Sequence, residues 1–123
     1  MSDNRENTEF ELDKKWGSII KVGWTGVPNV LLKEQGKLGL KALELNVLIN
    51  LIRFWWVAEN IPFPSPEKMS VEMGVSERTV YRAIASLEKN GFITRIQEED
   101  KPTKYDLSNL IKKLEAIKEE IIE

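Results

Sequence analysis

The sequence predicts an α+β fold that is mostly helical, and three observations lead to that prediction. Residues 42–58 are apolar on most sides of a helix, which is typical of a buried helix. Two serines, Ser65 and Ser76, each precede an amphipathic run and can cap its first turn. Two strand-like runs, 93–96 and 103–107, follow with a polar turn between them. We therefore expect a helical body with a two-stranded ribbon.

The first forty residues are predicted to be an extension of this body. Residues 1–15 are polar and acidic, and we expect them to form a disordered tail. Alternate apolar residues then predict a strand with one buried face; they are Trp16, Ile20, Val22 and Trp24. Pro28 can begin a short helix. Because aromatic side chains bury large areas, we expect residues 16–40 to pack on the core.

The helix predicted for residues 42–58 is apolar nearly all round, so one domain core can cover only part of it. Either the N-terminal strand covers the rest or a second copy of the chain does, and the sequence leaves both possibilities open. Arg53 and other polar side chains interrupt this run, which makes it too short and too polar to cross a bilayer. We therefore expect no membrane partner.

Two helices around a tight turn are predicted between residues 65 and 90. Pro66 follows the Ser65 cap at the first helical position, where no hydrogen-bonded N–H is needed. Gly74 stands where a left-handed residue commonly ends a helix. The second helix has an apolar stripe for the core, formed by Val80, Ala83, Ile84 and Leu87. Its outward face carries Arg78, Tyr81, Arg82, Ala85 and Lys89.

The C-terminal part of the chain predicts the ribbon and one more helix. Pro102 suits the turn between the two strands, because proline cannot donate to a strand ladder. We expect residues 108–123 to form a helix with Ser108 as its cap. A seam of apolar residues at three- and four-residue steps follows this helix; it contains Leu107, Leu110, Leu114, Ile117 and Ile121. The seam either docks on the body or serves as a dimerisation surface, and the pattern does not decide between these.

The predicted helix pair resembles a helix-turn-helix. The residues that carry the likeness are Met69, Ser70, Met73, Gly74, Val75, Val80 and Ala83. With the ribbon, residues 41–107 look like the winged helix-turn-helix domains of plasmid and phage replication initiator proteins and of bacterial transcriptional regulators. The resemblance implies sequence-specific binding of double-stranded DNA, with helix 77–89 in the major groove.

The residues expected to contact DNA fall into two groups. Arginine near the start of such a helix can bind guanine O6 and N7, and we expect base contacts from Arg78, Arg82 and Thr79. We expect phosphate contacts from hydroxyl and basic side chains, namely Ser76, Tyr81, Lys89, Lys68, Arg95, Lys101 and Lys104. Because a single domain of this size neutralises few phosphates, we also expect a homodimer that reads two half-sites about one helical turn apart.

The charge balance limits this interpretation. The net charge is −2, and residues 65–107 contain seven basic and eight acidic residues. Binding to DNA must therefore depend on where the charges lie rather than on their sum. A protein-interaction module that never touches DNA is the alternative.

Composition argues against several other kinds of site. The chain has no cysteine and no histidine, which excludes disulfides and histidine-based metal sites and fits a reducing cytoplasm. The consecutive acids 98–100 lie on a turn rather than across a cleft, and no glycine-rich phosphate loop is present. We therefore expect no enzymatic activity, cofactor, metal or small-molecule ligand.

Overall fold

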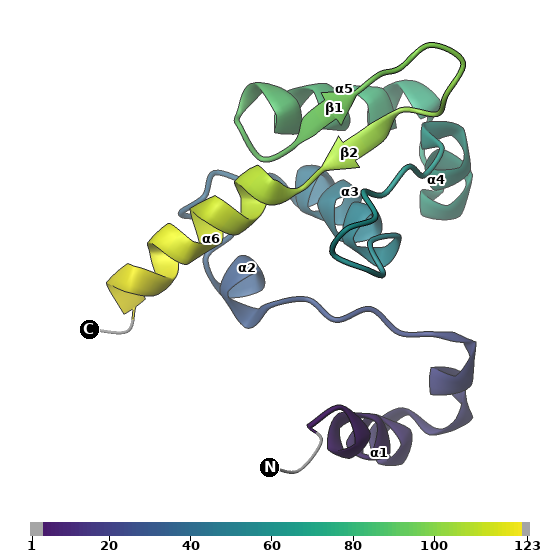
Figure 1. Ribbon diagram of the computed structural model, residues 1–123, viewed down its shortest axis with the longest axis vertical. Helices are drawn as coiled ribbons and strands as arrows, with labels where there is room; N and C mark the ends of the chain where they lie inside the picture. The colour runs from purple at the N-terminus through teal and green to yellow at the C-terminus, as the bar shows by residue number, and fades with distance from the viewer. Residues whose placement is uncertain (1–3, 122–123) are drawn as a thin grey trace.

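The computed structural model describes residues 4–121, and within them the chain is a mainly helical α+β structure with one two-stranded sheet (Figure 1). In chain order the elements are α1 (Asn4–Trp16), the 3₁₀-helix η1 (Gly17–Val22), α2 (Asn29–Lys33), α3 (Ala42–Arg53), α4 (Pro66–Met73), α5 (Glu77–Lys89), β1 (Thr94–Ile96), β2 (Lys104–Asp106) and α6 (Ser108–Ile121). The predicted α+β class is confirmed. Among the described residues, no helix is long and apolar enough to cross a bilayer.

The core forms where α3 packs against α5, with α6 and the ribbon adding further apolar side chains. Leu48 and Leu51 of α3 and Ile84 of α5 are fully buried there. Helix α3 ends at Arg53, five residues before the predicted end. The amides of Phe54 and Trp55 bond to carbonyls three residues back rather than four, so the α-helical pattern stops here. The indole N–H of Trp56 then donates to the Arg53 carbonyl at 2.8 Å.

Helices α4 and α5 form the predicted pair, and their caps are those that the sequence indicates. Ser65 Oγ accepts a hydrogen bond from the Lys68 amide at 3.2 Å, and Ser76 Oγ accepts one from the Thr79 amide at 3.1 Å. Gly74 ends α4 with a φ of 72°, a left-handed conformation that glycine adopts without strain. These short-range signals fix the relative position of the two helices.

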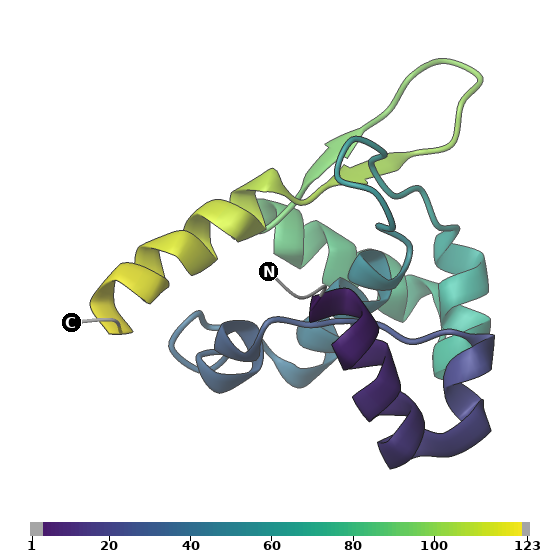
Figure 2. The same ribbon diagram turned by 60° about the horizontal axis from the view of Figure 1, so that its bottom comes forward.

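The ribbon pairs β1 and β2 antiparallel, with Arg95 opposite Tyr105. The Tyr105 amide also donates to the Pro62 carbonyl at 2.8 Å, which fastens the loop between α3 and α4 to β2. The turn of the ribbon extends away from the helices (Figure 2). At the start of α6 the predicted cap is corrected: Asp106 accepts hydrogen bonds from the amide and the hydroxyl of Ser108, so Ser108 donates.

The N-terminal segment differs most from the sequence prediction. Residues 4–16 form α1 in place of a disordered tail, and residues 17–22 form η1 in place of a strand. Gly17 and Gly23 have φ values of 70° and 113°, and these conformations interrupt an extended strand on both sides of η1. Helix α1 packs against η1, and an extended stretch joins this unit to α2 at a distance from the helical body (Figure 1).

The aromatic residues of that segment do not join the core. Trp16 is 55% exposed and Trp24 is 47% exposed, so the expected packing on the body is wrong for these side chains. The cover of α3 instead comes from α5, α6 and the ribbon of the same chain. Leu45, Val47, Leu48 and Leu51 are therefore buried within the chain, but not by the N-terminal strand that we expected to cover them.

Candidate nucleic-acid interface

The outer face of α5 is a continuous exposed surface. Arg78, Tyr81, Arg82, Ala85 and Lys89 are all exposed, while the predicted inner stripe of the helix is buried. Tyr81 also borders a groove of about 670 Å³ that lies between residues 63–66 at the start of α4 and the ribbon. The spacing of this helix therefore divides it cleanly into a packed face and a free face.

Arg78 and Arg82 are the strongest candidates for DNA recognition. They are four residues apart, so both project from one side of α5. Among the residues that the structure describes, neither guanidinium takes part in an ion pair or a side-chain hydrogen bond. Their donor forks are thus available to an external acceptor such as a guanine edge or a phosphate.

Other predicted contacts at the start of α5 are partly engaged within the chain. Thr79 is half-buried, and its hydroxyl lies 2.7 Å from the Ser76 hydroxyl. Both hydroxyls therefore serve the cap of the helix, and a base contact by Thr79 would have to break or share this hydrogen bond. Lys89 is exposed at the other end of α5.

A buried carboxylate fixes α5 to α3 from the inside. Glu44 of α3 is 6% exposed and accepts hydrogen bonds from the Lys41 amide at 2.8 Å and from the Ser86 hydroxyl of α5. Burial alone would raise the pKa of Glu44, but these hydrogen bonds and the charge of Lys41 hold that pKa below its ordinary value. The charged carboxylate thus sets the position of α5 relative to the body.

Two of the basic residues of the ribbon, Arg95 and Lys101, are held by acids. Arg95 forms an ion pair with Glu88 of α5 at 2.8 Å, and its amide also donates to the Glu88 carboxylate at 3.3 Å. The hydrogen bond from the Arg95 side chain is the main cause of a lowered pKa for Glu88. Lys101 lies 3.0 Å from Glu98 on the same turn. Both cations predicted to contact phosphate therefore have a partner already.

Lys68 and Lys104 lie together on a different surface. Both line a groove of about 570 Å³ between the loop after α3, the start of α4 and the ribbon. The sequence prediction placed these lysines around the DNA-binding helix but missed the groove. The sequence feature that could have indicated the groove is the adjacent pair Trp55–Trp56 near the end of the predicted helix 42–58. Adjacent helical residues do not share one face, so both rings cannot enter the same core. Trp56 is the one that lines the groove.

The apolar seam of α6 faces the body of the same chain. Leu107, Leu110, Leu114 and Ile117 are at most 8% exposed. Helix α6 packs on α2, and the first three of these leucines belong to the common core. The structure therefore supports docking of the seam, and these four residues are not free for dimerisation; the side chain of Ile121 lies outside the described part.

Comparison with known proteins gives two findings. A family model described as the DnaD N-terminal domain matches residues 27–122. The crystal structure of the N-terminal domain of the DnaD protein from Geobacillus kaustophilus HTA426 is similar, with a TM-score of 0.62 and 28% sequence identity over 84% of this chain and 86% of that one. None of the curated protein sequences gives a match.

The matched region begins at Val27, after α1 and η1, and it includes the helix pair, the ribbon and α6. It therefore contains every residue proposed above for the outer face of α5. Because the family model spans more than half of the sequence, the chain belongs to the family of DnaD N-terminal domains, which is a replication-related family.

Proposed function

We propose that this chain acts in DNA replication by binding double-stranded DNA, with α5 in the major groove and the ribbon as the wing of a winged helix-turn-helix. The observation that carries the proposal is the exposure of Arg78 and Arg82 on one side of a capped helix, without an ion-pair partner among the described residues. No catalytic step is part of this role, which is binding alone.

The chemistry of the free face suits major-groove reading. A guanidinium offers two parallel N–H donors that match guanine O6 and N7, and two such contacts one helical turn apart can read neighbouring bases. Lys89 lies at the far end of α5, where it can contact a phosphate. The exposed Ala85 has too small a side chain to hold the helix away from the groove floor.

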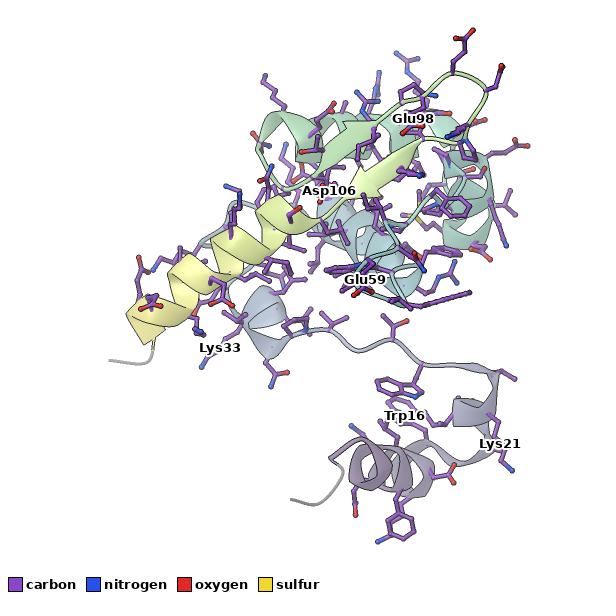
Figure 3. All side chains as sticks on the ribbon, in the orientation of Figure 1. Trp16, Lys21, Lys33, Glu59, Glu98 and Asp106 are labelled. Atoms are coloured by element: carbon purple, nitrogen blue, oxygen red, sulfur yellow. The ribbon has the colours of Figure 1, made fainter. Side chains whose placement is uncertain are left out.

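The test begins with selection of bound duplexes from a random pool, followed by measurement of affinity for the selected and a scrambled duplex. The change Arg78→Ala with Arg82→Ala should cost roughly 2–6 kcal/mol of discrimination, since each bidentate base contact is worth about 1–3 kcal/mol. The matched control is Lys21→Ala with Lys33→Ala. These exposed lysines of η1 and α2 lie away from α5 (Figure 3). Their replacement removes the same positive charge as the double arginine change.

A protein-interaction role without DNA is the second candidate, and one observation favours it. The turn of the ribbon presents Glu98, Glu99 and Asp100, all exposed, and the nearest lysine on this turn pairs with Glu98. Such a turn repels phosphate and suits a basic protein surface. Duplex binding that is insensitive to salt and unchanged in the double arginine variant would favour this second function.

Self-association is a further part of the proposal, because one domain makes few phosphate contacts. The available surface is the N-terminal unit rather than the α6 seam. There Ile19 is 65% exposed and Val22 is 90% exposed, whereas the seam is buried.

We predict that Ile19→Ser with Val22→Ser weakens dimer formation at least about tenfold, since burial of one such side chain is worth roughly 1.5–3 kcal/mol. Analytical ultracentrifugation measures the dissociation constant of the dimer directly. The control Val71→Ser changes a residue of α4 that is 76% exposed, between the values of Ile19 and Val22. A monomer at every concentration in the unchanged chain would contradict this part of the proposal.

A further inference from the structure

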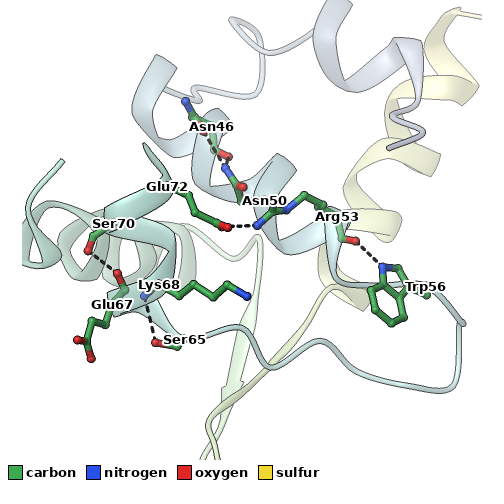
Figure 4. A network of polar contacts seen from close by, with 9 residues as sticks. All are labelled: Asn46, Asn50, Arg53, Trp56, Ser65, Glu67, Lys68, Ser70 and Glu72. Atoms are coloured by element: carbon green, nitrogen blue, oxygen red, sulfur yellow. Dashed lines mark hydrogen bonds and ion pairs between the residues drawn. The ribbon is translucent and has the colours of Figure 1, made fainter. Parts of the chain in front are cut away.

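Trp56 is an exposed aromatic side chain that is nevertheless held in one position. Its side chain is 84% exposed, yet its indole N–H donates to the Arg53 carbonyl at 2.8 Å. Arg53 in turn forms an ion pair with Glu72 of α4 at 2.6 Å (Figure 4). The Arg53 guanidinium also lies over the Phe54 ring. A flat apolar ring is thus presented to solvent on a braced loop, which costs little further ordering when a ligand stacks on it.

The ring belongs to the groove of about 570 Å³ described above. Two more apolar side chains of this groove are exposed: Val57 is 49% exposed and Phe63 is 60% exposed. The hydrogen bond from the Tyr105 amide to the Pro62 carbonyl fixes the loop beside Phe63 to the ribbon. The groove therefore has two exposed aromatic rings, Trp56 and Phe63, each attached to a fixed stretch of backbone.

The charges around the groove favour an anion. Lys68 comes from α4 and Lys104 from β2, and within residues 4–121 neither ammonium has an ion-pair partner. Figure 4 shows the Lys68 side chain extended from α4 toward the side on which Trp56 lies. Glu59 is the acidic residue among the groove's lining residues, so the positive charge exceeds the negative by one.

We propose that this groove binds single-stranded DNA, with bases stacked on Trp56 and Phe63 and phosphates bound by Lys68 and Lys104. Fixed aromatic faces interleaved with cations are what a single strand requires, because every base has a face that can stack and every step has a phosphate. A duplex does not fit this chemistry, since its base faces are already stacked on one another. The site is separate from Arg78 and Arg82 and does not depend on them.

The test measures the binding of a labelled oligothymidylate of about 15 nucleotides, a length suited to such a site, by fluorescence anisotropy. We expect Trp56→Ala to weaken binding about 5- to 100-fold, as loss of one stacked base does. Trp56→Phe should retain most of the affinity, since a ring remains. Lys68→Gln with Lys104→Gln should reduce the slope of log affinity against log salt by about 1.4, since each phosphate contact to a single strand contributes about 0.7.

Two control variants separate this proposal from others. Trp16→Ala removes an indole that is 55% exposed outside the groove and should leave oligothymidylate binding unchanged. Arg78→Ala with Arg82→Ala should weaken duplex binding alone, so failure of either proposal is recognised independently of the other. Equal affinity in the unchanged chain and in Trp56→Ala overturns the inference. If Trp56→Ala instead abolishes self-association and spares oligothymidylate binding, the groove is an interface between copies and the inference is equally wrong.

Discussion

The outer face of α5 and the ribbon both carry basic residues, but they offer them to a partner in different ways. On α5, Arg78 and Arg82 project from a rigid helix, and within the described residues no acid engages them. On the ribbon, Arg95 pairs with Glu88 and Lys101 pairs with Glu98, and of its basic residues only Lys104 has no ion-pair partner within the described part of the chain. A count of basic residues alone would predict that the two surfaces bind DNA equally well.

The difference shows that the local placement of acids decides which cations are available. Glu88 lies one turn or more beyond the arginines of α5 and reaches the ribbon instead, where it accepts hydrogen bonds from the side chain and the amide of Arg95. This explains how a chain with a net charge of −2 can still present a basic face. A phosphate would have to displace Glu88 before it could bind Arg95, and that exchange costs the existing ion pair.

The largest effect expected from this comparison concerns the two carboxylates that hold α5. Glu44 joins α5 to α3 in the interior, whereas Glu88 joins it to the ribbon at the surface. We predict that Glu44→Gln lowers the free energy of unfolding by about 1–3 kcal/mol, because the charged acceptor of a buried hydrogen bond is lost. Glu88→Gln should cost about 0–1 kcal/mol, as exposed ion pairs do. Urea denaturation of the two variants provides the measurement.

The same pair gives a prediction for pH. The folded chain holds the pKa of Glu44 below its ordinary value of 4.5 despite burial, so the ionised carboxylate stabilises the fold above about pH 4.5. This stabilisation is lost as the pH falls through the lower folded pKa. Glu44→Gln should therefore flatten the acid limb of stability against pH, and Glu88→Gln should act in the same direction because the pKa of Glu88 is also lowered. An unchanged acid limb would show that Ser86 and Lys41 do not favour the charged form.

Much of α5 could be predicted because its signals are local. Ser76 caps it, and residues at three- and four-residue steps separate its two faces. The ion pairs of the ribbon could not be predicted in this way. Arg95 and Glu88 are seven residues apart, and the turn between them must be known before the pair can be assigned.

The N-terminal segment shows that the spacing of apolar residues alone does not always predict the secondary structure. Alternate apolar residues from Trp16 to Trp24 match a strand, yet this segment contains no partner strand and two glycines with positive φ. A strand is stabilised by its neighbours, so a short pattern without a neighbour can adopt another conformation. The groove with Trp56 was missed for a related reason, since its walls come from three separate segments of the chain.

The smallest expected effect concerns the acids on the turn of the ribbon. Glu98→Gln, Glu99→Gln and Asp100→Asn together should raise affinity for duplex DNA by less than about fivefold at low salt, because exposed charge interactions are weak. The gain should vanish at high salt, because salt screens interactions between exposed charges. Removal of Glu98 also frees Lys101, whose only described ion-pair partner is that carboxylate.

The control Glu34→Gln, Glu115→Gln and Glu119→Gln removes the same charge from α6 and the segment after α2. If both triple variants gain equally, net charge governs binding and the turn does not approach DNA. If the turn variant gains more, the ribbon lies near the phosphates, and its acids weaken a contact that Lys101 would otherwise make.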